Sequence, residues 1–141
     1  MSRNEMSSRR PLRKVIVRVI SLVLRAYGLL LSFERNMSRR NFQGIYRRVE
    51  WRRLQPPRSS VSCENACRAL NLACVLYFKE VQCLQRSAAL VCLLRDLGIP
   101  ATLVIGAQQL PFRAHAWVEV NRRVINDSVS AVELYGVLDR L

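Results

Sequence analysis

The chain of 141 residues contains one histidine, His115, and the residues around it in sequence could make it a catalytic base. Cys83 lies upstream, at the start of a long apolar helical pattern, and Asp127 lies downstream of a short turn. A cysteine thiolate is a nucleophile, an imidazole can take up and return its proton, and a carboxylate can orient the imidazole. The order Cys83, His115, Asp127 therefore indicates a nucleophilic cysteine site, in which no other histidine could serve as the base.

The expected position of Cys83 at a helix N-terminus suits this chemistry. The positive end of the helix dipole favours a thiolate, and a neighbouring imidazolium favours it further. The backbone N–H of Cys83 would donate a hydrogen bond to the oxyanion formed during attack. A second oxyanion donor is not assigned, although Gln82 is adjacent.

Hydrophobic periodicity predicts the elements that hold these side chains. In chain order they are helices over residues 61–78 and 83–97, strands over 102–106, 114–120 and 124–126, and a closing helix over 132–141. Gly98 and Pro100 end the second helix. On the middle strand, His115 and Trp117 face one way and Ala116 the other, because side chains alternate along a strand.

The register of the last two strands restricts the site. A two-residue turn at Asn121-Arg122 would place Asp127 opposite Ala116, on the wrong face of the sheet for His115. If Asp127 pairs with His115, the hairpin must be irregular or its second strand must end early.

Charge divides the chain into two parts. Residues 1–60 hold 15 Lys and Arg against three acids, whereas residues 61–141 hold eight against seven. A helical pattern over residues 12–54 weakens near 41–44, and Pro56 and Pro57 then end it. We predict a basic helical N-terminal segment, residues 1–59, followed by a core, residues 60–141, that carries Cys83, His115 and Asp127.

The basic segment narrows the choice of partners only slightly. Arginine-rich surfaces bind nucleic acid, but the chain has neither zinc-finger spacing nor an RNA-binding aromatic motif, so nucleic acid is not predicted as a partner. Arg18 and Arg25 interrupt the apolar residues 15–33, which argues against a spanning helix and against a secretory signal. A partner protein, an acidic peptide or peripheral contact with a membrane surface stays open.

The cysteines are predicted to be thiols rather than disulfides or metal ligands. Five is an odd number and no export signal is evident, so we expect the reducing bacterial cytoplasm. Cys63, Cys67 and Cys74 share one face of a predicted helix, but there is no Cys-x-x-Cys pair and His115 is the only imidazole. These three and Cys92 are interpreted as small buried apolar side chains, and neither metal nor cofactor is predicted.

Four segments carry a resemblance to a known family. They are VQCLQRSAAL (81–90), LLRDLGIPA (93–101), LVIG (103–106) and PFRAHAWVEV (111–120), followed by Asn126-Asp127. This ordered set strongly resembles the lasso-peptide leader peptidases, which are the transglutaminase-like B proteins of lasso-peptide biosynthesis. The resemblance covers residues 60–141 and implies an α+β fold. In it, a transglutaminase-like or papain-like core carries the cysteine on a helix that packs on a small antiparallel sheet, preceded here by the basic extension.

The resemblance implies proteolysis of a ribosomally synthesised lasso precursor peptide, with Cys83, His115 and Asp127 as the triad. Such peptidases remove the leader, and an ATP-dependent macrolactam cyclase then closes the ring. Some carry a leader-recognition domain, and others receive the leader from a separate recognition protein. Residues 1–60 lack the strands of such a domain, so the split type is expected, with the basic segment as the docking surface. Two alternatives stay open, namely a transglutaminase-like acyltransferase and a non-catalytic basic binding module.

Overall fold

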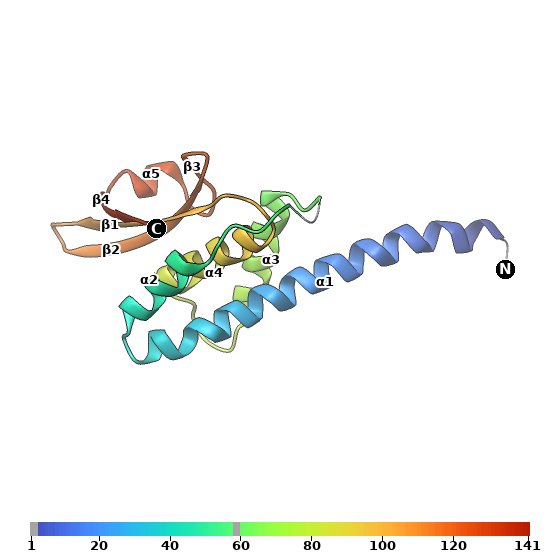
Figure 1. The fold of residues 1–141 in the computed structure, drawn as a ribbon, viewed down its shortest axis with the longest axis horizontal. Helices are drawn as coiled ribbons and strands as arrows, with labels where there is room; N and C mark the ends of the chain where they lie inside the picture. The colour runs from blue at the N-terminus through green and yellow to red at the C-terminus, as the bar shows by residue number, and fades with distance from the viewer. Residues whose placement is uncertain (1–2, 58–59) are drawn as a thin grey trace.

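The computed structural model describes residues 3–57 and 60–141, and the side chains of residues 12–57 and 60–141. The described part consists of helices followed by a four-stranded sheet (Figure 1). In chain order the elements are α1 (Arg3–Ser38), α2 (Phe42–Trp51), α3 (Cys63–Leu76), α4 (Cys83–Asp96), β1 (Thr102–Gln108), β2 (Arg113–Val120), β3 (Arg123–Val124), α5 (Val129–Val132) and β4 (Gly136–Arg140).

The sheet has the strand order β3-β2-β1-β4, and each neighbouring pair is antiparallel. The helices α1 to α4 lie on one side of it, and the short α5 lies on the other (Figure 1). The α+β fold predicted from the sequence, with a cysteine-bearing helix on a small antiparallel sheet, is therefore confirmed.

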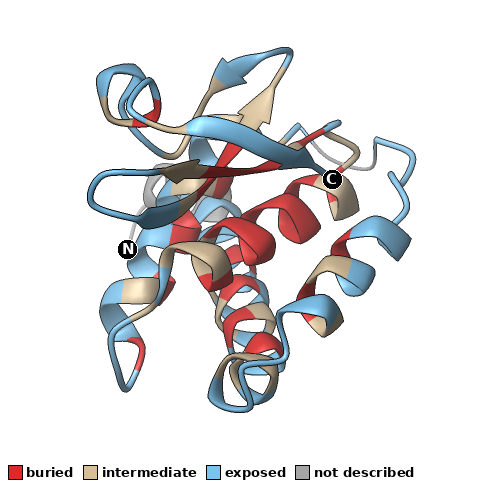
Figure 2. Ribbon diagram, turned by 90° about the vertical axis from the view of Figure 1, so that its left-hand side faces the viewer, coloured by how far each residue is buried: buried red, intermediate tan, exposed pale blue. Residues whose placement is uncertain are grey.

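Helix α4 is the centre of the core. Its residues from Ser87 to Leu94 are all buried, because α1 and α3 cover one side and β2 the other (Figure 2). The helix ends where Gly98 adopts a φ of 81°. A side chain at Gly98 would meet the backbone of Pro57 at 2.6 Å, so the predicted left-handed glycine cap also makes room for the preceding loop.

The second half of α1 and helix α2 contribute to the same core. Leu30, Phe33, Ile45 and Val49 are completely buried and belong to one hydrophobic cluster with α3, α4 and the inner face of the sheet. Residues that the sequence assigned to a separate N-terminal segment thus pack against the core formed by residues 60–141, and the division near residue 59 stays a prediction about domains.

Arg95, near the end of α4, links three segments to this core. Its guanidinium donates hydrogen bonds to the carbonyl oxygens of Val49 (2.5 Å), Ala101 (3.0 Å) and Leu141 (3.0 Å). One charged side chain therefore satisfies the carbonyl groups of α2, of the loop before β1 and of the last residue.

The predicted weak point in the N-terminal helix is close to the observed break. Residues 39–41 separate α1 from α2, Arg40 has a φ of 52°, and the Asn41 side chain accepts a hydrogen bond from the Gly44 N–H at 3.0 Å. This is an asparagine N-cap, which starts α2 in a new direction.

The predicted closing helix over residues 132–141 is wrong. Residues 136–140 form β4, which pairs with β1, and Leu103 and Leu141 exchange two backbone hydrogen bonds of 2.8 and 2.9 Å. Without β4, the far edge of β1 would leave a row of unpaired backbone groups. Tertiary pairing therefore overrides the helical spacing of the leucines, and Gly136 weakens the helix further.

Candidate active site

Cys83 is the first residue of α4, as predicted. The preceding residue, Gln82, makes no side-chain capping bond to the helix, so this N-terminus is not closed by its own cap. Two residues after Cys83, the buried side chain of Gln85 donates hydrogen bonds to the Leu30 carbonyl (3.0 Å) and to the Glu34 carboxylate (3.2 Å), both on α1. The helix start that carries the thiol is therefore held against α1 by buried hydrogen bonds.

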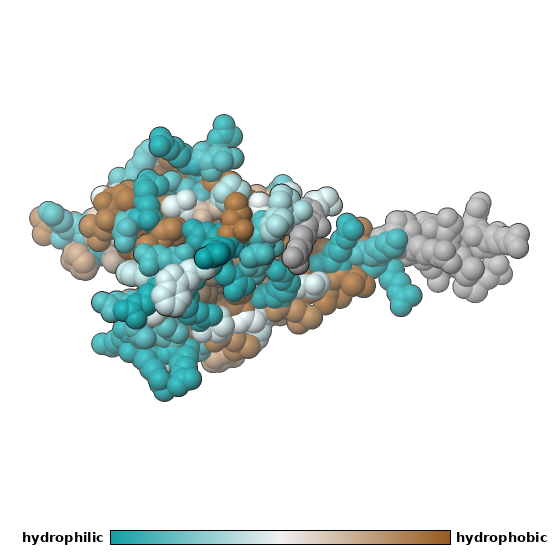
Figure 3. All heavy atoms as spheres, viewed as in Figure 1, coloured by the Kyte–Doolittle hydropathy of each residue, from teal (hydrophilic) through white to brown (hydrophobic). Residues whose placement is uncertain are grey.

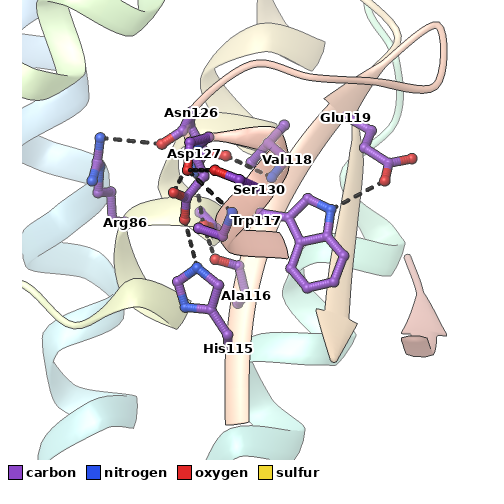
Figure 4. A network of polar contacts seen from close by, with 12 residues as sticks. Arg86, His115, Ala116, Trp117, Val118, Glu119, Asn126, Asp127 and Ser130 are labelled. Carbon is purple, nitrogen blue, oxygen red and sulfur yellow. Dashed lines mark hydrogen bonds and ion pairs between the residues drawn. The ribbon is translucent and has the colours of Figure 1, made fainter. Parts of the chain in front are cut away.

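His115 and Asp127 form a close pair. Nε2 of His115 lies 2.5 Å from Oδ2 of Asp127, and Oδ1 of Asp127 accepts a hydrogen bond from the Ser128 N–H at 2.8 Å (Figure 4). The two side chains are 23% and 28% exposed, so the pair is partly shielded from water. Both carboxylate oxygens are thus used, and the imidazole is oriented through one nitrogen, which leaves Nδ1 for a second partner.

An early end to the strand brings Asp127 to His115. The turn at Asn121-Arg122 has two residues, both with positive φ (51° and 61°), and the β2–β3 ladder stops at Val124. Ile125 makes one more backbone hydrogen bond, to the Val118 carbonyl at 3.0 Å, and beyond it the chain leaves the sheet, so Asp127 is not confined to the face opposite His115. The early strand end expected from the register argument is confirmed.

The side chain of Asn126 accepts a backbone hydrogen bond of β2 that a longer β3 would otherwise accept. Its side-chain oxygen accepts from the Val118 N–H at 2.7 Å, and its amide nitrogen donates to Ser87 Oγ at 3.0 Å. The buried Ser87 hydroxyl in turn donates to the Ala116 carbonyl at 2.9 Å. The segment that carries Asp127 is therefore fixed by hydrogen bonds to both β2 and α4.

The Asp127 carboxylate is favoured over its protonated form. Burial alone would raise the pKa of Asp127, but the hydrogen bonds from His115 and the Ser128 N–H and the charge of Arg86 more than offset it, so the pKa lies below its usual range. Arg86 lies on α4, and its guanidinium also donates to the Asn126 carbonyl at 3.5 Å. A stable negative charge is therefore available to an imidazolium at His115.

Tyr135 lies beside the imidazole ring of His115, on the face of the sheet turned away from α4. The ring centres of His115 and Tyr135 are 5.2 Å apart. Gly106 is opposite His115 in the β1–β2 register, and a side chain there would lie 2.9 Å from Trp117 and from the Tyr135 Cβ atom. Gly106 thus leaves the space in which the aromatic residues beside His115 pack.

Cys83 and His115 line one cleft with a volume of about 730 Å³. Gln82, which precedes Cys83 in the chain, lines it as well, and another part of the wall comes from the corner between α1 and α2. The residues of that corner are Met37, Ser38, Arg40, Phe42 and Tyr46. The two candidate side chains therefore share a single cavity, and part of its wall comes from the segment that the sequence had placed outside the core.

The other four cysteines lie in environments that disfavour the thiolate. Burial raises the pKa of Cys63, Cys74 and Cys92, and it raises the pKa of Cys67 to about 12. Among the residues that the structure describes, no three His, Cys, Asp or Glu side chains are grouped closely enough to hold a metal ion. Cys83 is the cysteine that lines the cleft.

Sequence reasoning selected Cys83, His115 and Asp127 as candidate site residues, but it did not select the residues that position them. Ser87, Asn126 and Tyr135 were not selected, because none has a motif or unusual spacing of its own. The one available signal was the position of Asn126 beside Asp127, in a strand that had to end early. The cleft wall at residues 37–46 carried no signal, because it depends on how α1 packs.

Comparisons with known proteins show which family and which relative the chain resembles. The model of a family described as the transglutaminase-like superfamily matches residues 27–140. The chain is also 42% identical over 70 residues to the microcin J25-processing protein McjB of Escherichia coli. That match covers 48% of this chain and 34% of McjB, so the chain spans about a third of the relative's length. No solved structure matches the chain.

Proposed function

Because the chain belongs to the transglutaminase-like superfamily, we propose that it is a cysteine peptidase that removes the leader from a lasso precursor peptide. The observation that carries the proposal is the close pair of His115 and Asp127, beside a cleft that His115 shares with Cys83. The similarity to McjB, whose name describes the processing of microcin J25, supports the class of substrate.

The proposed reaction begins with transfer of the Cys83 proton to Nδ1 of His115, because Nε2 is occupied by Asp127. The thiolate attacks the scissile carbonyl carbon, and the backbone N–H of Cys83 at the α4 N-terminus donates to the resulting oxyanion. The imidazolium then protonates the leaving nitrogen, the C–N bond breaks, and the core peptide departs with a free amine.

The second half of the reaction hydrolyses the thioester. His115 takes a proton from water, the hydroxide attacks the thioester carbonyl, and the thiolate leaves and is protonated again. Throughout both halves Asp127 holds the ring and balances its positive charge. No cofactor takes part in this scheme.

We further propose that a separate recognition protein presents the leader. Residues 3–57 are helical or irregular in the structure, so this segment offers no strand edge to which a leader could add. The remaining partners of the proposal are the precursor peptide and the ATP-dependent macrolactam cyclase that would use the released amine. A cytoplasmic location in a bacterium belongs to the same proposal, and five free thiols are consistent with it.

Mass spectrometry of a precursor peptide incubated with the protein and the recognition protein tests this function. We expect leader and core fragments with the wild type and with Cys74→Ala, and none with Cys83→Ala. Cys74 is a matched control, since it is a half-buried thiol on α3 that does not line the cleft. Equal cleavage by Cys83→Ala would remove the proposed nucleophile. A product carrying an added amine instead of water would identify an acyltransferase.

A further inference from the structure

Helix α1 carries an exposed apolar surface that the core does not use. Its members lie within one side of the helix by their spacing, and each is between 46% and 65% exposed. We call this surface the α1 apolar stripe; it consists of Ile16, Val17, Ile20, Leu24 and Leu31. Figure 3 shows apolar side chains exposed along this helix where it leaves the body of the molecule. A contiguous exposed apolar surface along one side of a helix is typical of a binding site.

Over residues 12–33 the charged residues of the same helix are all basic. Residues 12–33 contain four basic residues, Arg13, Lys14, Arg18 and Arg25, and no acid. Lys14, Arg18 and Arg25 fall in one row by helical spacing, next to the apolar stripe. The first two are exposed, and Arg25 is 3.6 Å from Asp96. An apolar stripe flanked by the exposed positive charges of Lys14 and Arg18 is complementary to a surface with an apolar interior and anionic groups at its edge.

Helix α1 is long and apolar enough over Leu12–Ser38 to cross a membrane by length and composition, but its packing prevents it. Four residues of this range are buried in the core and would have to leave it if the helix entered a membrane: Leu22, Ala26, Leu30 and Phe33. The apolar part of the helix that lies outside the core, residues 12–21, is roughly 15 Å long at about 1.5 Å per residue, half the thickness of a hydrocarbon layer, and residues 3–11 before it are mostly polar or charged by sequence. The helix can therefore lie on a bilayer but not span it.

We propose that α1 attaches this protein to the surface of a bilayer rich in anionic phospholipid. The stripe enters the boundary between headgroups and acyl chains, and Lys14 and Arg18 contact lipid phosphates. A bilayer fits better than a groove in a protein, because Leu12, Val15 and Val19 are exposed as well, at 48% or more. Together with the stripe they make most of the projecting helix apolar, whereas a groove covers one narrower face.

Vesicle sedimentation of the full chain tests the attachment without reference to peptidase activity, so its result is independent of the proposed function. The wild type is incubated with vesicles of phosphatidylcholine alone and with an equal mixture of phosphatidylglycerol and phosphatidylcholine. We expect it to pellet with the anionic vesicles only and to be released by high salt, because the basic row supplies part of the attraction. Ile20→Glu should weaken the partitioning by at least roughly tenfold, since it removes a buried aliphatic side chain from the bilayer.

Leu138→Glu is the matched control, because Leu138 is 69% exposed but lies on β4, across α4 from α1 (Figure 1). It should pellet like the wild type, and circular dichroism should show the same melting for all three proteins. Absence of the wild type from both pellets would overturn the proposal, as would equal partitioning of Ile20→Glu. Salt-resistant binding to both kinds of vesicle would overturn the role of anionic lipid. A dimer in gel filtration that Ile20→Glu dissociates, without vesicle binding, would assign the stripe to a second copy.

Discussion

Replacement of Asp127 by asparagine changes the number of acceptor oxygens beside His115 from two to one while keeping the size of the side chain. In the native protein one oxygen faces His115 Nε2 at 2.5 Å and the other accepts from the Ser128 N–H at 2.8 Å. The asparagine amide can satisfy only one of these two donors. If its oxygen stays on Ser128, its NH₂ group faces Nε2 and forces the opposite tautomer, which carries the proton on Nδ1.

The magnitude follows from these contacts. The loss of one hydrogen bond to a charged group costs about 1.5–3 kcal/mol, equivalent to roughly a 10- to 150-fold loss in rate. The wrong tautomer adds to this, because Nδ1 then cannot accept the Cys83 proton. In a serine protease the same exchange lowers kcat by about 10⁴. We therefore expect Asp127→Asn to lower kcat/KM by between about 10² and 10⁴, with most of the effect on kcat.

Initial rates of precursor cleavage, followed by liquid chromatography and mass spectrometry with the recognition protein present, measure this loss. Glu133→Gln is the control, because it removes a negative charge from an exposed residue that follows α5 and does not line the cleft. Thermal melting of both variants separates a chemical loss from unfolding. Full activity of a folded Asp127→Asn protein would refute the reasoning, since the imidazole would then need no carboxylate.

Three further expectations follow from the same structure. Ser87→Ala should lower the free energy of unfolding by about 1–3 kcal/mol in denaturant titration, because it leaves the Asn126 amide and a strand carbonyl without a buried partner; an unchanged midpoint would contradict this network. Phe42→Ala should raise KM for the precursor several-fold with little change in kcat, since it removes part of the cleft wall, whereas Trp51→Ala, on the same helix but outside the cleft, should not. Asp127 should also make stability depend on acid pH: its pKa is lowered in the folded state, so the contribution is complete above its unfolded pKa of about 4 and is lost as pH falls through the folded value. In chemical denaturation at several pH values, Asp127→Asn should therefore lose less stability between neutral and acid pH than the wild type, and parallel pH curves would count against the pairing.

Local patterns in the sequence were sufficient for most of the scaffold. Helix α4 begins at Cys83 and ends before Gly98 as predicted, because a run of apolar residues at helical spacing and a glycine cap act within a few residues of chain. Strand β2 likewise presents His115 and Trp117 on one face, since alternation is a property of the strand itself. The ordered Cys83, His115 and Asp127 could be selected for the same reason, because each residue type is scarce or locally placed.

Tertiary structure alone decided how these residues meet. The closing helix predicted over residues 132–141 became β4, because the open edge of β1 needs hydrogen-bond partners that no local pattern records. Asp127 reaches His115 only because Asn126 takes over the strand pairing, which depends on Ser87 of α4. The cleft wall formed by residues 37–46 depends on how α1 packs against α4. Residue types and local periodicity can thus be read along the chain, whereas the contacts between distant segments arise from burial and hydrogen-bond satisfaction, which only the assembled fold determines.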